Sequence, residues 1–288
     1  MRFCLTGRKV PQRRRAWQQQ GRAGLVFLAA LCCAGCLVVA VGHRVEIGQH
    51  RLRVHVAGEG SPAVVMEAGL GETLETWSRV WPEVARFTRV CVYDRAGLGR
   101  SDPGPRPRSS ERIVEELRLL LARKQVQPPY VLVGHSFGGL IVRLFAGQHP
   151  AEVAGLVLID PTPLDFPFLE GQLLDARARA RRDTVLGLAP QAAREEARGI
   201  RLSAEQVRHA GSVPDVPIVV LSSARPEEPP AFRAAWRRMQ QELVGRIEAD
   251  EHEIVEDAGH YLQVDVPHRV VDAIQRVVTR ARDRALED

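Results

Sequence analysis

Residues 130–139 read YVLVGHSFGG, and this stretch decides the fold. A run of strand-forming residues, YVLV, leads into the pattern G-x-S-x-G at Gly134, Ser136 and Gly138, and a helical pattern then continues to Pro150. A strand that passes into a helix through so tight a turn holds the serine at strained backbone angles, where side chains in place of the two glycines would collide. The helix N-terminus also presents free N–H groups to negative charge that develops nearby. We therefore expect Ser136 to be a nucleophile.

Strand-like and helix-like segments alternate along the rest of the chain. Strands are predicted at 51–57, as an edge strand with period-two alternation, and at 63–66, 90–93, 130–133, 156–159, 218–221 and 253–255. Helices are predicted at 72–87, from Ser109 or Ser110 to about 124, at 231–247 and at 267–282. This order indicates an α/β fold with a mainly parallel central sheet and helices on both faces.

One long segment, residues 161–214, interrupts the alternation. It is rich in Ala and Arg and contains weak helical patterns but no strand-like run. We expect a helical lid inserted between two strands. Four of its arginines spread around a helix instead of lining one face, which is typical of a solvated surface and identifies no substrate: Arg177, Arg179, Arg181 and Arg182.

The N-terminal region differs in composition from the body of the protein. Residues 1–22 hold seven basic side chains and no acidic one, whereas the rest of the chain holds 33 basic and 35 acidic residues. The formal net charge of +5 therefore arises in this segment, and the nearly neutral body, residues 43–288, has no electrostatic footprint for a nucleic acid.

Residues 23–42 follow the basic segment and carry no charge. As a helix they would be about 30 Å long, which matches the hydrocarbon core of a bilayer. We expect an uncleaved membrane anchor, because the apolar region of a cleaved signal peptide is typically shorter than this segment. A cleaved signal peptide is the alternative. The basic flank favours a cytoplasmic N-terminus, so the body would lie outside the cytoplasm, anchored or secreted.

Several further segments resemble the α/β-hydrolase family, in the right order and over roughly residues 45–283. They are EAGLGETLETW at 67–77, YDRAGLGRSD at 93–102, GLVLIDP at 155–161, PIVVLSS at 217–223 and AGHYLQVDVP at 258–267. The first stands where the family has its oxyanion loop, although Ala68-Gly69 replaces the common His-Gly. The donors there are backbone N–H groups, and by position the resemblance implies those of Leu70 and Phe137.

A serine hydroxyl needs a base to take its proton, and position selects that base among nine histidines. The base must come from a loop at the carboxyl end of the sheet, after the acid in chain order. His260 follows the last predicted strand and precedes the last helix. His252 lies at the opposite end of that strand, His268 opens the helix, and His135 is expected to point elsewhere. We predict that His260 is the general base.

The triad acid, which holds the imidazole in the correct tautomer, has two candidates. The family usually supplies it after the seventh strand, but the loop there reads ARPEEPP and offers only Glu227 and Glu228. Other members supply it one strand earlier, where this chain has Asp160 at a strand end. Asp160 is our preferred acid, the glutamate pair is the alternative, and a purely structural role for Asp160 before Pro161 also stays open. Asp94 and Arg95 are expected to form a loop and a salt bridge.

The predicted function is that of a serine hydrolase, similar to carboxylesterases and lipases, which cleaves carboxylic esters through an acyl-enzyme intermediate. Aminopeptidase or amidase activity, or acyl transfer to an alcohol, would use the same triad. A non-catalytic scaffold of the same fold is the alternative of another class. Ser136 argues against epoxide hydrolase chemistry, where the family's nucleophile is Asp. The spacing of Cys and His residues predicts no metal site, no cofactor is expected, and the sequence leaves the oligomeric state open.

Overall fold

The structure, a computed structural model, describes residues 42–287. Its centre is an eight-stranded sheet with the strand order β1-β2-β4-β3-β5-β6-β7-β8. Strands β3 to β8 run parallel to one another, whereas β1 and β2 are antiparallel to their neighbours. The strands are β1 (His43–Glu46), β2 (Arg51–Ala57), β3 (Ala63–Glu67), β4 (Val90–Tyr93), β5 (Tyr130–His135), β6 (Val153–Ile159), β7 (Ile218–Ser223) and β8 (Glu251–Val255). The mainly parallel sheet predicted from the sequence is confirmed.

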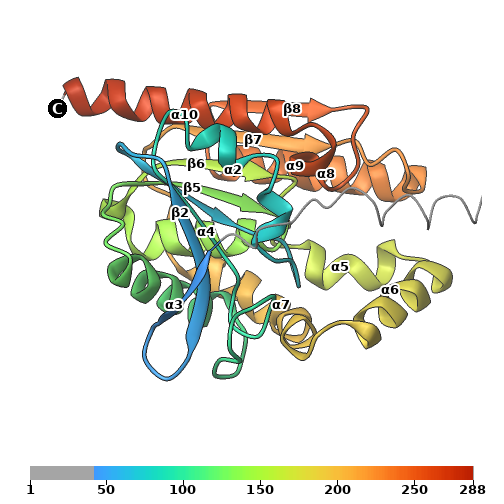
Figure 1. Ribbon diagram of the computed structural model, residues 1–288. Coiled ribbons are helices and arrows are strands. Elements are labelled where there is room, and N and C mark those ends of the chain that lie inside the picture. The colour runs from blue at the N-terminus through green and yellow to red at the C-terminus, as the bar shows by residue number, and fades with distance from the viewer. Residues whose placement is uncertain (1–41, 288) are drawn as a thin grey trace, which may run out of the picture. The chain divides into compact units, whose positions relative to one another are not determined.

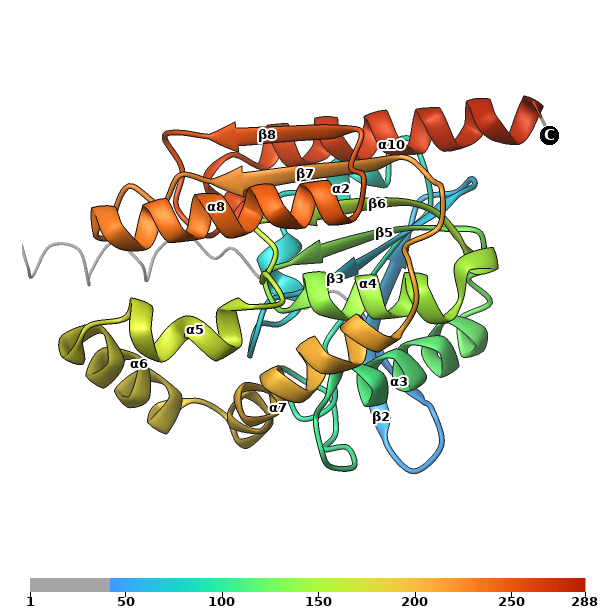
Figure 2. The same ribbon diagram turned by 180° about the vertical axis from the view of Figure 1, so that it is seen from behind.

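Helices cover both faces of this sheet (Figure 1). The long α10 (Pro267–Glu287) packs on β5, β6 and β7 with the short α2 (Trp81–Val84) beside it. The opposite face is covered by α3 (Ser110–Arg123), α4 (Gly138–Gln148) and α8 (Pro230–Arg246), and α8 runs alongside β7 (Figure 2). Shorter elements are η1 (Leu74–Trp77), η2 (Pro150–Glu152) and α9 (Leu262–Asp265). Because both faces are covered, every residue of β3, β4, β5 and β7 is buried.

The predicted edge strand at 51–57 is not at the edge. The four residues of β1 pair with its outer side in antiparallel register, with His43 opposite Val54 and Glu46 opposite Arg51. The segment HRVE is mostly exposed and too short to show an alternating pattern, so the sequence carried no signal for it.

The helix predicted at 72–87 is also wrong. The structure has a 3₁₀ turn at η1 and a single helical turn at α2, joined by a bend. The carboxylate of Asp94 accepts the backbone N–H of Leu74 at 2.8 Å, and Pro82 stands in the first turn of α2. Both features favour two short turns over one continuous helix. Trp77, Val80 and Val84 of this segment are buried in the structure.

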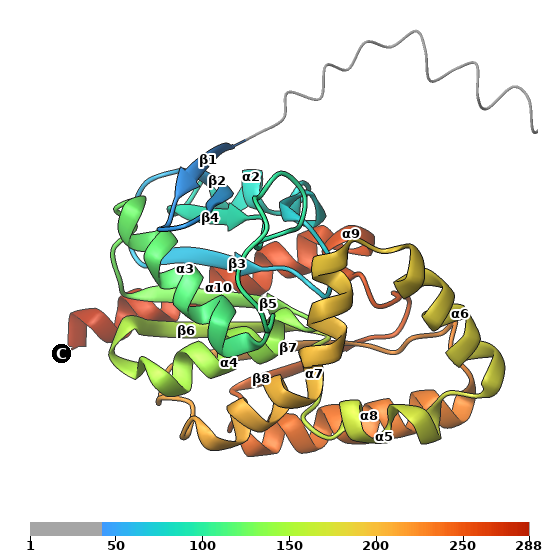
Figure 3. The same ribbon diagram turned by 90° about the horizontal axis from the view of Figure 1, so that it is seen from below.

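Residues 161–214 form three helices and no strand, as predicted. They are α5 (Phe166–Leu173), α6 (Ala176–Leu188) and α7 (Gln191–His209). α5 and α6 lie beyond the carboxyl ends of the parallel strands, and α5 runs beside α8, whereas α7 packs on α3 and α4 (Figure 3). Phe166 packs against Phe232 and Trp236 of α8, whereas α6 buries no residue.

The predicted basic segment at 1–22 lies outside the described residues, as does the predicted anchor at 23–42 apart from Gly42. Between residues 42 and 287, no helix has both the length and the apolar character needed to cross a bilayer.

Candidate active site

Ser136 stands on the turn between β5 and α4, with a backbone φ of +51°. The glycines on either side of it are required by close backbone contacts. A Cβ at Gly138 would lie 2.3 Å from the carbonyl oxygen of Glu67, and one at Gly134 would lie 2.7 Å from the carbonyl oxygen of Gly138. The turn therefore accepts no side chain at either glycine, and it places Ser136 at the carboxyl end of β5.

Three of the predicted site residues meet at this end of the sheet. The Nε2 atom of His260 lies 2.9 Å from the Oγ of Ser136, and its Nδ1 atom lies 2.6 Å from Oδ2 of Asp160. Ser136 follows β5, Asp160 follows β6, and His260 lies in the loop between β8 and α9. Carboxyl ends of neighbouring parallel strands share one edge of the sheet, so residues far apart in the chain converge there. The geometry is that of a nucleophile, a base and an acid in series.

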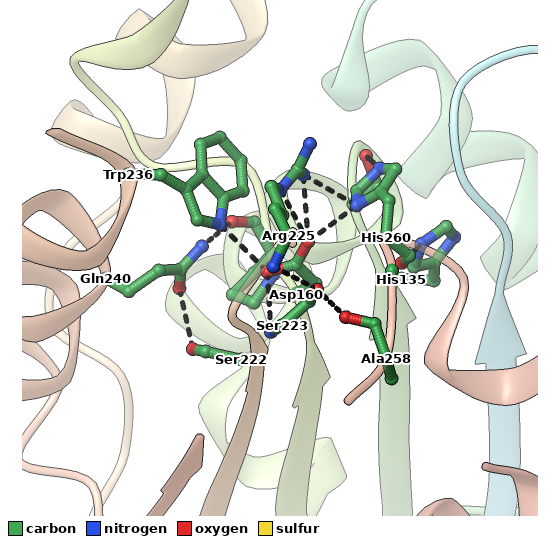
Figure 4. Close-up of polar contacts among 12 residues, drawn as sticks. His135, Asp160, Ser222, Ser223, Arg225, Trp236, Gln240, Ala258 and His260 are labelled. Carbon is green, nitrogen blue, oxygen red and sulfur yellow. Dashed lines mark hydrogen bonds and ion pairs between the residues drawn. The ribbon is translucent and has the colours of Figure 1, made fainter. Parts of the chain in front are cut away.

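Asp160 is fully buried and makes hydrogen bonds on both oxygens. Its Oδ1 accepts the backbone N–H of Ser223 at 3.1 Å and the indole N–H of Trp236 at 2.9 Å. Its Oδ2 accepts from the guanidinium of Arg225 in addition to facing His260 (Figure 4). Burial by itself would raise the pKa of Asp160, but the charge of Arg225 and the hydrogen bonds from His260 and Trp236 outweigh burial and lower it.

The alternative acids are not in contact with the imidazole. Within residues 42–287, neither Glu227 nor Glu228 forms a hydrogen bond or ion pair with His260. The loop after β7 instead supplies Arg225, whose Nη2 atom lies 2.7 Å from Nδ1 of His260. The sequence offered Glu227 and Glu228 as possible acids in this loop, and the part played by the arginine was not predicted. Its only signal was a basic residue at the position where the resemblance implies a carboxylate.

The proton affinity of His260 is low in this setting. Its side chain is 22% exposed. Burial, and then the positive charge of Arg225, lower the pKa of His260 to about 4, although the hydrogen bond to Asp160 acts in the opposite direction. The imidazole is therefore neutral at pH 7 and able to accept a proton.

The loop predicted to hold the oxyanion is fixed by a buried arginine. Arg95 donates to the carbonyl oxygens of Ala68 and Gly69 at 2.8 and 2.6 Å. The N–H groups of Gly69 and Gly71 are bound in turn by the carboxylates of Glu72 and Glu196. The backbone polar groups on both sides of Leu70 are thus hydrogen-bonded, and these bonds fix the position of its backbone.

The two predicted oxyanion donors themselves are free for another acceptor. No acceptor between residues 42 and 287 takes a hydrogen bond from the backbone N–H of Leu70 or from that of Phe137. Phe137 directly follows Ser136 and stands at the N-terminus of α4. Their role as oxyanion donors stays a prediction, and the arrangement is compatible with it.

Arg95 is the centre of a buried ion network, which agrees with the structural role expected for it. It pairs with Glu67 at 2.8 Å and with Glu196 of α7 at 2.7 Å, and all three side chains are at most 1% exposed. Asp94, its neighbour, pairs with Arg53. Burial raises the pKa of Glu67, against the charge of Arg95. Through Glu196 the inserted helices are tied directly to the oxyanion loop.

His135 lies beside His260 and forms no hydrogen bond with Ser136 within residues 42–287. Its Nε2 atom lies 2.9 Å from the carbonyl oxygen of His260, and its Nδ1 atom lies 3.2 Å from the carboxylate of Glu72. The rings of His135 and His260 are 4.7 Å apart. His135 thus connects the histidine loop to the oxyanion loop.

Comparison with known proteins agrees with this architecture. Residues 62–195 match the family model described as alpha/beta hydrolase fold. The chain has the α/β-hydrolase fold, and the match to the family model covers a little under half of it. The chain is also 28% identical to the uncharacterized protein YqjL of Bacillus subtilis strain 168 over 234 residues, 80% of this chain and 89% of that protein.

Solved structures with the α/β-hydrolase fold also superpose on the chain. Epoxide hydrolase A from Mycobacterium thermoresistibile does so with a TM-score of 0.64 and 18% identity, covering 83% of this chain and 98% of that one. An alpha/beta hydrolase fold protein from Burkholderia ambifaria gives a TM-score of 0.59 and 23% identity, covering 82% and 99%. At these identities the likeness establishes the fold only.

Proposed function

We propose that this α/β-hydrolase-fold protein is a serine hydrolase that cleaves carboxylic esters. The observation that carries the proposal is the continuous chain of contacts from Ser136 Oγ through both nitrogens of His260 to Asp160, at 2.9 and 2.6 Å. A serine adjacent to a base that is itself oriented by a buried acid is the arrangement that nucleophilic acyl transfer requires.

The proposed reaction has two halves. His260 Nε2 takes the proton of Ser136 as Oγ attacks the carbonyl carbon, and the backbone N–H groups of Leu70 and Phe137 receive the oxyanion. The imidazolium, held by Asp160, then gives its proton to the leaving oxygen, and an acyl-enzyme remains. Water enters, loses a proton to His260, and attacks the acyl carbon. The acyl–oxygen bond then breaks, the acid leaves, and His260 returns its proton to Oγ of Ser136.

The ester is favoured over the amide by the acid–base chemistry of His260. An alkoxide leaving group needs less help from the general acid than an amine does. The nucleophile also separates this chain from epoxide-opening chemistry, which the resemblance associates with Asp, whereas this chain has Ser136. Aminopeptidase or amidase activity and acyl transfer remain variants of the same triad.

A hydrolase assay on the full-length chain tests the proposal. We would measure hydrolysis of p-nitrophenyl esters of increasing acyl length by the wild type, Ser136→Ala and Ser212→Ala. Ser212 is exposed in the loop before β7, so its replacement is the matched control. We expect turnover and fluorophosphonate labelling in the wild type and the control, and neither in Ser136→Ala. A folded wild type without turnover or labelling would instead favour a non-catalytic scaffold.

Adding an alcohol to the same assay separates hydrolysis from acyl transfer. Water and the alcohol compete for one acyl-enzyme, so a hydrolase releases mainly free acid, and an acyltransferase forms mainly the new ester. We expect free acid to dominate at millimolar alcohol.

The cellular location is a separate proposal. We propose that residues 23–42 tether the protein to a membrane with the catalytic body outside the cytoplasm, on the sequence pattern alone. Fractionation of cells that express the full chain, followed by protease treatment of intact cells or spheroplasts, tests it. Recovery of the protein in the soluble cytoplasmic fraction would overturn it.

A further inference from the structure

Arg225 occupies the loop after β7, where the resemblance places a carboxylate. Its backbone has a φ of +49°, a region that few residues other than glycine adopt. The backbone is held there by its N–H, which donates to the Oγ of Ser223 at 2.9 Å, and by its carbonyl, which accepts from Glu228 at 3.0 Å. A strained backbone that the surroundings hold so firmly points to a functional constraint on the side chain.

The side chain of Arg225 is packed into the triad. It is 9% exposed, and its guanidinium lies 3.9 Å from the centre of the Trp236 ring. Nε and Nη2 both contact Oδ2 of Asp160, at 3.1 and 2.8 Å. Figure 4 shows the guanidinium between Trp236 and His260, directly above Asp160. Arg225 and His260 therefore share one carboxylate oxygen.

The contact between Arg225 and His260 creates a conflict of donors. Nη2 is always a donor, and it lies 2.7 Å from Nδ1 of His260. If Nδ1 carries a proton, it donates to Asp160 and repels the guanidinium. If Nδ1 is bare, it accepts from Arg225 and loses the bond to Asp160, and the proton then moves to Nε2, where it blocks proton transfer from Ser136. A doubly protonated ring is the least favourable state, because it places two cations against a single carboxylate.

Groups from all the surrounding elements contribute to the electrostatics at His260. The charged and titratable groups that interact with its ring are Asp160, Arg225, His135, Glu72 and Tyr261. Two further carboxylates, those of Glu227 and Asp265, face the neighbouring Gly259. Among these, Arg225 is the fixed positive charge, and after burial it is the largest cause that lowers the pKa of His260. Asp160 acts in the other direction, but Arg225 already neutralises part of its charge.

We propose that Arg225 is a positioning residue that sets how readily His260 takes up a proton. Its guanidinium claims part of the charge of Asp160 and opposes the imidazolium, so the base stays free under acidic conditions where an ordinary catalytic histidine is protonated. The inference rests on the proposed function, because it concerns the base of the same triad. We therefore expect an esterase that stays active in acidic surroundings. His260 would be a weaker base but would remain unprotonated to a lower pH.

The direct test is a titration of the His260 ring by NMR. The full-length chain is labelled with ¹⁵N in its histidine side chains, and the His260 signal is assigned by its loss in His260→Gln. The wild type is compared with Arg225→Met, which keeps the length without the charge, and with Arg225→Lys, which keeps the charge. Arg237→Met, an exposed arginine of α8, is the matched control. The pH profile of kcat/KM is recorded for each variant.

In Arg225→Met, we expect the His260 midpoint and the acidic limb of kcat/KM to rise together by roughly one pH unit or more. Both should stay near the wild-type value in Arg225→Lys and Arg237→Met. An unmoved midpoint in folded Arg225→Met overturns the proposal. So does a loss of kcat/KM restricted to carboxylate-bearing esters without a shift of the midpoint, because Arg225 would then bind substrate.

The proposal can also be tested if Arg225→Met does not fold. In that case Arg225→Gln and the wild type are titrated by NMR. A pH midpoint of His260 at or above about 6.5 in the wild type, the ordinary value, overturns the proposal. Because NMR needs no turnover, the two hypotheses can fail separately. A wild type without esterase activity whose His260 midpoint still depends on Arg225 contradicts only the proposed function.

Discussion

His260 and Asp160 are one hundred positions apart in the chain, yet Nδ1 of one lies 2.6 Å from Oδ2 of the other. The contact exists because β6 places Asp160 and the loop after β8 places His260 at the same edge of the sheet. The carboxylate can accept the Nδ1 proton and so leave Nε2 free to face Ser136.

Replacing Asp160 with Asn should remove most of the activity. The amide cannot stabilise an imidazolium and can hold the ring in the wrong tautomer, so we expect kcat to fall by about 10³–10⁴-fold. Ester hydrolysis with single-turnover kinetics measures it. Glu227→Gln and Glu228→Gln are the controls and should keep the wild-type kcat. A loss in Glu228→Gln as large as that in Asp160→Asn would contradict the assignment of Asp160.

The activity of the wild type should persist into acidic solution. His260 acts only when it is unprotonated, so kcat/KM is retained above its pKa and is lost as the pH falls through about 4. We therefore expect kcat/KM to stay constant between pH 7 and roughly 5.5. A histidine with its ordinary pKa of about 6.5 would already be mostly protonated at the lower end of this range, so its kcat/KM would have fallen. A stopped assay measures this profile, with an ester whose uncatalysed hydrolysis is negligible over the pH range and whose product is quantified at one fixed pH. A limb near the ordinary value would show that the site does not depress this pKa.

A methyl group at Gly138 should disturb the oxyanion loop. Its Cβ would lie 2.3 Å from the carbonyl oxygen of Glu67, which belongs to backbone and cannot move away cheaply. We expect Gly138→Ala to lose activity and about 1–3 kcal/mol of stability, as overpacked sites do. Denaturant unfolding and ester hydrolysis measure the two effects.

Gly245→Ala is the control for this substitution. Nothing lies within 4 Å of a Cβ at Gly245 in α8, so it should keep full activity and gain about 0.5–1 kcal/mol from helix formation. Equal effects of the two substitutions would show that the contact at Glu67 does not matter.

The buried ion network of Arg95, Glu67 and Glu196 should contribute strongly to the stability of the protein. Glu196→Gln removes the charge that Arg95 meets on α7 and leaves a buried cation partly uncompensated, with a cost of about 3–5 kcal/mol. Urea unfolding measures it, and kcat should fall as well because the Gly71 N–H loses its charged partner.

The matched exposed pair is Arg118 and Glu152, whose side chains are 44% and 26% exposed. Glu152→Gln should cost no more than about 1 kcal/mol, since solvent screens the pair. Similar losses in Glu152→Gln and Glu196→Gln would argue against a special role for the buried network.

The sequence by itself determined the features that depend on local backbone geometry. The G-x-S-x-G turn located Ser136, because few other patterns can pass from a buried strand into a helix so tightly. Buried parallel strands read as apolar runs, so the sheet was predictable, and the strandless run of helical patterns at 161–214 was too. Position after the last strand also selected His260 among nine histidines.

Tertiary structure alone decided what depends on contacts between distant segments. The strand β1 has no pattern of its own, and the start of η1 is fixed by Asp94, from another loop, which takes the N–H of Leu74. Asp160 and the glutamates after β7 were both open until the fold placed Asp160 against the imidazole. Arg225 could not be found from the sequence, because an arginine in a surface-like loop gains its meaning only when the fold buries it against Asp160 and His260. Burial and the summed charges of several elements set these interactions, and no single segment of sequence encodes either.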